Sequence, residues 1–157
     1  MTEPVTIVLL GRPVPWAHKN AARSGVRYTP AKQRANAETL ATVAQQEMRG
    51  REMLTDAVTI EILAEMPIPK SWSRRKRDKA LVGEIRHTKK PDGSNIQKQV
   101  EDALSGVVYR DDALIDEWHG RKVYGLQPKL VVTVSPVSTA ETRFQLLRRR
   151  RALVPSS

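Results

Sequence analysis

The sequence has no cysteine, few aromatic residues and no long hydrophobic run. Without cysteine the chain cannot form a disulfide framework, a thiolate zinc site or a cysteine nucleophile. Its histidines also lack the spacing of zinc ligands, so any catalysis must use oxygen ligands or nitrogen bases. No stretch approaches the roughly 18 uninterrupted apolar residues of a membrane helix, and residues 1–10 lack the basic lead of a signal peptide. We therefore expect a cytoplasmic protein with no membrane partner.

The length and composition are those of one globular domain. A chain of 157 residues can bury a single hydrophobic core. The 39% hydrophobic and 28% charged residues are typical of a folded chain. We expect residues 1–147 to form this domain, and residues 148–157, which begin with a run of four arginines, to form a disordered basic tail.

Positive charge is in excess and is unevenly distributed. Lys and Arg number 27 against 17 Asp and Glu, so a polyanion is the expected partner. Residues 70–90 include nine basic and two acidic residues, whereas residues 91–117 include two basic and seven acidic residues. Grouped carboxylates repel one another and a polyanion, and a bound cation would relieve that repulsion. Charge alone leaves the alternative that these carboxylates are solvated or paired with nearby Lys and Arg.

Hydrophobic periodicity predicts a small α/β (α+β) single domain with a mixed sheet flanked by helices. Thr29 is the expected N-cap and Pro30 the first position of the first helix, which follows a loop over residues 11–29. The order is strand, helix, strand, helix, helix, strand, strand. The expected strands are 5–10, 58–67, 118–124 and 129–134, and the expected helices are 30–49, 73–82 and 94–105.

The helix expected after Pro91 has one apolar and one polar face. The apolar face contains Ile96, Val100, Ala103 and Leu104, and the polar face contains Ser94, Lys98, Glu101, Asp102 and Ser105. Asp92 lies just before the helix, where its carboxylate is near free N–H groups. Asp111 and Asp112 lie in a turn before an apolar segment, and such a turn could return their carboxylates to the start of the helix. This arrangement predicts a magnesium site. Taken singly, Asp92 also fits an ordinary turn before a helix.

Three motifs occur together in this part of the chain. They are Lys89-Lys90-Pro91-Asp92-Gly93-Ser94-Asn95-Ile96-Gln97-Lys98, then Asp102-Ala103-Leu104-Ser105-Gly106, then the pair Asp111-Asp112. Together they resemble the core of the RusA family of Holliday junction resolvases. The opening strand, followed by Gly11, Pro13, Pro15 and Trp16, is similar to the N-terminal half of that family, so the resemblance extends over about residues 5–134.

The resemblance implies a RusA-like fold and a homodimeric endodeoxyribonuclease of recombination and repair. Such an enzyme depends on Mg²⁺, with Mn²⁺ as a substitute, and resolves four-way DNA junctions by cutting two strands symmetrically. Position by position, the implied residues are the catalytic, metal-binding carboxylates Asp92 and Asp112, the catalytic lysine Lys98, and the supporting residues Ser94, Asn95 and Asp111, of which Asp111 is a further metal ligand.

Ser94 departs from the family pattern, which has an aspartate at this position. Magnesium keeps several waters, so Ser94 can hold a metal-bound water, and the oxygens of Asp111 or Asn95 can replace the missing ligand. The departure leaves an alternative function open, which is a catalytically weak or inactive protein that binds DNA or RNA junctions. The acidic residues favour the enzyme, because a protein that only binds DNA gains nothing from carboxylates beside its basic surface.

Two groups of residues are candidates for contacts with nucleic acid. Aromatic rings interleaved with basic residues can stack on unpaired bases while the cations bind phosphate. The first group, in the N-terminal loop, is Trp16, Lys19, Arg23, Arg27 and Tyr28. The second group, on and after the short basic helix, is Arg74, Arg75, Lys76, Arg77, Lys89 and Lys90. Trp16 has the alternative of packing over the edge of the core.

Overall fold

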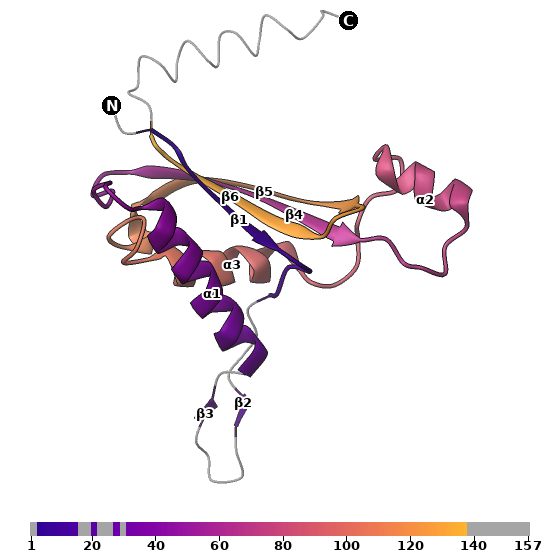
Figure 1. Ribbon diagram of the computed structural model, residues 1–157, viewed down its shortest axis with the longest axis horizontal. Helices are drawn as coiled ribbons and strands as arrows, with labels where there is room; N and C mark the ends of the chain where they lie inside the picture. The colour runs from indigo at the N-terminus through magenta and orange to yellow at the C-terminus, as the bar shows by residue number, and fades with distance from the viewer. Residues whose placement is uncertain (1–2, 16–19, 22–26, 29–30, 138–157) are drawn as a thin grey trace, which may run out of the picture.

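The computed structural model describes residues 3–15, 20–21, 27–28 and 31–137, and Figure 1 shows the arrangement of its elements. The predicted small α+β domain with a mixed sheet is confirmed. In chain order the elements are β1 (Val5–Leu10), β2 (Asn20–Ala21), β3 (Arg27–Tyr28), α1 (Ala31–Glu47), β4 (Val58–Pro67), α2 (Arg74–Leu81), α3 (Gly93–Leu104), the 3₁₀ turn η1 (Asp112–Leu114), β5 (Ile115–Gly125) and β6 (Lys129–Pro136).

The main sheet has the strand order β1-β6-β4-β5. Strand β6 is antiparallel to both β1 and β4, whereas β4 and β5 are parallel. A parallel pair needs a crossover connection, and the chain provides it through α2 and α3 before it enters β5. Helices α1 and α3 lie on the same side of the sheet, and α2 lies beyond one end of it (Figure 1). Strand β5 is therefore an edge strand with α3 beside it.

The core lies between this sheet and helices α1 and α3. Alternate residues of β4 are buried, as the period of two predicts, and the apolar stripes of both helices face them. The predicted core faces of β4 and α3 are confirmed. The buried residues of these elements are Val58, Ile60, Ile62, Ala64 and Met66 in β4, Leu130, Val132 and Val134 in β6, Leu40 and Ala44 in α1, and Ile96, Val100, Ala103 and Leu104 in α3.

One buried contact between the helices is polar. Gln99 of α3 is 2% exposed and donates its side-chain N–H to the backbone carbonyl of Gln33 in α1, with an N···O distance of 2.9 Å. A buried amide without a partner would destabilise the fold, so this hydrogen bond makes the position compatible with the core. It also fixes how α1 lies along α3.

The structure differs from the predicted elements at several boundaries. The expected loop over residues 11–29 contains the antiparallel strands β2 and β3, in which Asn20 pairs with Tyr28. Strand β5 begins three residues earlier than predicted because it continues alongside β4 as far as Val58. The predicted cap Thr29, the predicted first helical residue Pro30 and the predicted tail 148–157 lie outside the described residues. None of the helices in the described segments is long and apolar enough to cross a membrane.

Candidate active site

Asp92 is the N-cap residue of α3, and its side chain makes no hydrogen bond to the helix. Asp92 does lie just before the helix, as predicted, but none of the free helix N–H groups there donates to its carboxylate. Instead, Lys90 Nζ donates to Asp92 Oδ2 at 2.7 Å. The Asp92 side chain is 49% exposed and the Lys90 side chain 83% exposed, and ion pairs this open to solvent contribute at most about 1 kcal/mol. The carboxylate is thus oriented by a cation that a stronger partner can displace.

Lys122 of β5 holds the segment that precedes Asp92. Its ammonium group donates to the backbone carbonyl of Lys89 at 2.8 Å and to that of Pro91 at 2.9 Å. Both bonds are charge-assisted, which makes them stronger than bonds between neutral groups. Our sequence analysis did not identify Lys122. The sequence feature that could have identified it is the alternation of β5, which places this lysine on the face of the strand that points toward the core.

The polar face of α3 begins in the first turn, directly after Asp92. Ser94 is exposed and Asn95 is half-buried, both in the first turn. Lys98 lies one turn further along, at the spacing that places it on the same side of the helix as Ser94. Its Nζ is 3.8 Å from Asp102 Oδ1. Ser94 and Lys98 therefore share one exposed face of the N-terminal half of α3, and Asp92 lies just before that half.

Asp111 and Asp112 form a second group of carboxylates. Asp111 caps η1, because its Oδ1 accepts the Ala113 backbone N–H at 2.8 Å. This hydrogen bond lowers the pKa of the Asp111 carboxyl, and a side-chain hydrogen bond with Asp112 lowers it further. Both residues are exposed. The two carboxyl groups are thus adjacent and open to solvent, and their oxygens are of the kind that binds a hard cation.

The two groups lie at opposite ends of α3. The helix has 12 residues, which at about 1.5 Å per residue gives a length of about 18 Å. After the helix the chain makes a tight turn, closed by the Gly106 N–H donating to the Tyr109 carbonyl at 2.8 Å. Asp111 therefore follows the C-terminal end of α3. The expectation that this turn returns the two carboxylates to Asp92 is wrong within one chain. Across the described segments, no three His, Asp or Glu side chains are grouped so that they could hold a metal ion.

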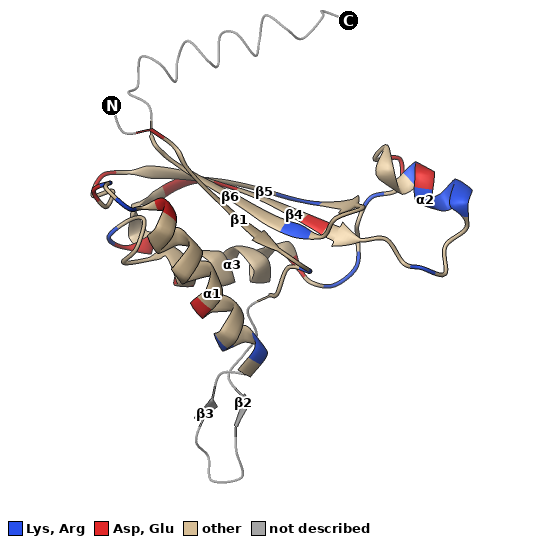
Figure 2. Cartoon of the chain, in the orientation of Figure 1, with Lys and Arg blue, Asp and Glu red and all other residues tan. Residues whose placement is uncertain are grey.

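Charge is divided between the same two ends, as Figure 2 shows. The acidic side chains Glu101, Asp102, Asp111 and Asp112 are at the C-terminal end of α3. Helix α2 and the segment after it form the basic end, with Arg74, Arg75, Lys76, Arg77, Lys89 and Lys90, all exposed. The structure thus brings the second predicted group of DNA contacts to the same end of α3 as Asp92.

Aromatic packing attaches the basic helix to the sheet. The Trp72 ring meets the Tyr124 ring of β5 edge-on, with centroids 5.2 Å apart. Lys76 Nζ lies 4.1 Å and Lys89 Nζ 6.0 Å from the Trp72 ring centroid, both within cation–π range. In the first predicted group, Trp16, Lys19 and Arg23 lie outside the described residues. Arg27 and Tyr28 are described only as backbone in β3.

Two comparisons place the chain among known sequences. A family model described as "Endodeoxyribonuclease RusA" matches residues 11–135. The uncharacterized protein YqaN of Bacillus subtilis (strain 168) is 35% identical to this chain over 111 residues, which is 69% of this chain and 78% of YqaN. The family match includes Asp92, Lys98, Asp111 and Asp112, together with basic helix α2.

Proposed function

The chain belongs to the RusA endodeoxyribonuclease family, and we propose that it is a cytoplasmic, homodimeric, Mg²⁺-dependent endonuclease that resolves four-way DNA junctions in recombination and repair. The main support is that Asp92, at the start of α3 beside the basic end of the molecule, and Lys98, within the first two turns of the same helix, are both exposed. A DNA backbone bound to that basic end would lie within reach of these two side chains.

The proposed roles follow from the chemistry of each side chain. Asp92 and the Asp111–Asp112 pair would hold the metal through carboxylate oxygens, with Ser94 and Asn95 supporting, and these are the hard donors that Mg²⁺ prefers. When bound, Mg²⁺ supplies Lewis-acid polarisation of the scissile phosphate and a water of lowered pKa, and Mn²⁺ can replace it. The Lys98 ammonium neutralises negative charge that develops on the phosphate.

A homodimer explains how carboxylates at opposite ends of α3 can serve one site. In a two-fold dimer the same surface of each chain faces the other. The acidic end of one chain can then meet the basic end of its partner, an arrangement that their opposite charges favour. Each site would take Asp92 and Lys98 from one chain and the Asp111–Asp112 pair from the other. Two such sites, related by the two-fold axis, match two opposed strands of a four-way junction.

A second candidate function is junction binding without hydrolysis. The observation that favours it is Ser94, which supplies no negative charge where the family pattern has an aspartate. If the protein is a monomer, the distance between Asp92 and the Asp111–Asp112 pair also favours binding without hydrolysis. The basic end would bind DNA equally well in either case.

Incubation with a labelled four-way junction separates these two functions. In Mg²⁺ or Mn²⁺ we expect cuts in two opposed strands near the crossover, and with EDTA we expect binding without cuts. The products are read on a denaturing gel, and linear duplex of the same sequence is the control substrate. Junction binding without cleavage in either metal would refute the enzyme and favour the binding protein.

Replacing Ser94 by Asp tests whether this position faces the metal. An added carboxylate strengthens a hard-cation site, so the Ser94→Asp variant should need about tenfold less Mg²⁺ for half-maximal cleavage. The measurement is a titration of cleavage rate against Mg²⁺ concentration. Ser94→Asn is the matched control, since it has nearly the same size as Asp without the charge. Equal Mg²⁺ requirements for both variants would place the metal elsewhere.

A further inference from the structure

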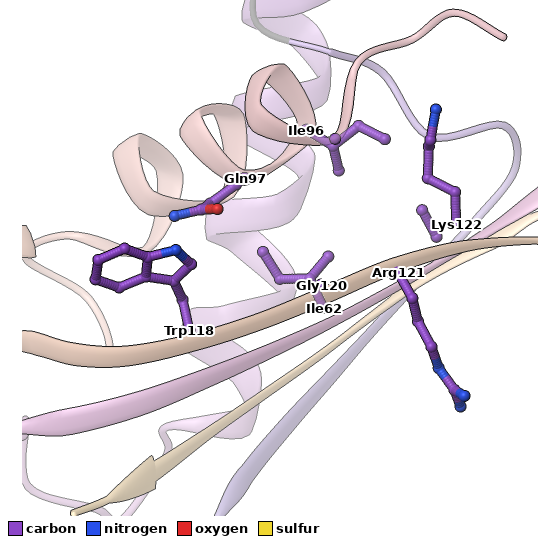
Figure 3. Close-up of a pocket in the computed structure, with 9 residues that line it drawn as sticks. Ile62, Ile96, Gln97, Trp118, Gly120, Arg121 and Lys122 are labelled. Carbon is purple, nitrogen blue, oxygen red and sulfur yellow. The ribbon is translucent and has the colours of Figure 1, made fainter. Parts of the chain in front are cut away.

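A pocket of about 310 Å³ lies between α3 and the edge strand β5, next to Asp92. Gly120 is at its centre, and Trp118 and Lys122 flank it, two residues away on the same face of the strand. In Figure 3 the Trp118 ring lies below the Gln97 side chain at one end, Lys122 stands at the other end, and Arg121 points away. The lining residues on α3 and β4 are Gly93, Ile96, Gln97, Ile62 and Ala64.

The pocket exists because Gly120 has no side chain. A Cβ atom added there would have no atom within 4 Å, and the backbone of Gly120 is not in the left-handed region. Neither close packing nor backbone conformation therefore requires glycine at this position. Gly125 in the same strand is different, because a Cβ there would collide with the Glu65 side chain. What glycine at position 120 does is leave an open space on this face of the sheet.

The side chains around this space suit a flat ring with polar edges. Trp118 is 57% exposed, whereas Tyr124 on the same face of β5 is 7% exposed, so one face of a large aromatic ring is available for stacking. Gln97 Nε2 donates to Glu101 Oε1 at 2.6 Å, which fixes the amide and leaves its carbonyl oxygen as an acceptor. Ile62 and Ile96 provide apolar walls, and Lys122 adds positive charge.

We propose that this pocket binds one unstacked nucleobase of the DNA, a role that rests on the proposed junction-cleaving function. Gly93 lines the pocket and directly follows Asp92, so a base in the pocket belongs to a nucleotide beside the phosphate that Asp92 and Lys98 would act on. Bases stack readily on aromatic side chains. They also leave the helix at lowest cost where pairing is already disturbed, as at a crossover. The pocket would thus select which phosphate is cut.

Gly120→Val fills the pocket and provides the test. Valine suits a strand, and the open space at Gly120 accepts its side chain. We measure binding by fluorescence anisotropy in EDTA, with an intact four-way junction and with junctions in which each nucleotide flanking the crossover is in turn made abasic. Loss of one stacked base corresponds to about 5- to 150-fold weaker binding. Gly120→Val should weaken binding of the intact junction by this factor and should not weaken binding of the junction that lacks the pocket base.

Three further variants control the experiment. His119→Val introduces the same side chain on the opposite face of β5 and should bind every junction as the wild type does. Trp118→Ala removes the stacking surface from a side chain that is largely exposed, so it tests the pocket even if Gly120→Val does not fold. Trp118→Phe should recover most of the affinity that Trp118→Ala loses.

Three outcomes would contradict either the base-binding pocket or the proposed endonuclease function. Wild-type affinity in both Gly120→Val and Trp118→Ala would overturn the base pocket, while wild-type cleavage of the junction would still support the endonuclease. Equal weakening on intact and abasic junctions would also overturn it, and dissociation of the dimer in sedimentation would then identify the pocket as an interface. If the wild type neither cuts nor prefers junctions, the endonuclease is refuted. A base-dependent loss in Gly120→Val on single-stranded oligonucleotides would then still support the pocket.

Discussion

Replacing Asp92 by Asn should lower the rate of junction cleavage at least about 100-fold, because a metal site loses that much when an important oxygen ligand is altered. The substitution preserves size and removes one negative charge. Asp92 is exposed and makes no hydrogen bond to α3, so the fold should persist. Junction affinity should stay the same or increase, because a carboxylate near phosphate is repulsive. Asp112→Asn should behave in the same way. Cleavage is measured on denaturing gels and binding on native gels.

Mixing the two inactive variants tests where the site lies. If each site takes Asp92 from one chain and Asp112 from the other, a mixed dimer of Asp92→Asn and Asp112→Asn contains one site with both carboxylates intact. About half of the dimers in an equimolar mixture are mixed, so about a quarter of the wild-type sites should return. The product should be a junction nicked in one strand. If mixed dimers form and the mixture still stays inactive, both carboxylates come from the same chain.

A second mixture controls for the residual activity of the single variants. Asp92 and Lys98 lie along the same half of α3, so a mixed dimer of Asp92→Asn and Lys98→Ala has one substitution in each site. This mixture should remain inactive in a dimer with shared sites and also in a dimer with separate sites. Recovery of cleavage in it would show that Lys98 and Asp92 serve different sites.

The core of the fold could be predicted from the sequence because its signals are local. Alternation in β4 and the apolar face of α3 both follow from the period of the element. Ser73 accepts the Lys76 N–H and begins α2 one residue from the predicted start. Each of these features depends on residues within a few positions of one another. The motifs on α3 were recognisable for the same reason.

The arrangement of the candidate site depends on contacts between distant segments, so the sequence did not predict it. A turn after α3 could direct Asp111 toward either end of the helix. The burial of Tyr109 and its β-bridge to Leu54 keep Asp111 at the C-terminal end. Both contacts depend on residues outside the motif. Lys122 and Gly120 become meaningful only when β5 is placed beside α3. No pattern within β5 specifies that neighbour.

Tyr109 is the residue whose loss should cost the most stability near the site. It is fully buried, and its hydroxyl donates to the Glu101 carbonyl at 3.1 Å. Tyr109→Ala should lower the free energy of unfolding by about 3–5 kcal/mol, as for other large aromatic residues in cores. This is a large part of the roughly 5–15 kcal/mol that stabilises a domain. Tyr109→Phe removes only the hydrogen bond and should cost about 1 kcal/mol. Urea denaturation at pH 7 measures both.

The pH dependence of stability, compared between the wild type and Tyr109→Phe, tests whether the Tyr109 hydroxyl is buried. Burial raises the pKa of Tyr109 above its usual value, and the Glu101 carboxylate raises it further. The unfolded chain therefore releases this proton more readily than the folded one. The resulting stability is fully present below about pH 10, the ordinary pKa of tyrosine, and is lost as the pH rises above it. Phe at this position has no such loss, so the advantage of wild type over Tyr109→Phe should shrink and then reverse between about pH 9 and pH 11 in urea titrations. Parallel stability curves for the two proteins over this range would mean that the Tyr109 hydroxyl is open to water.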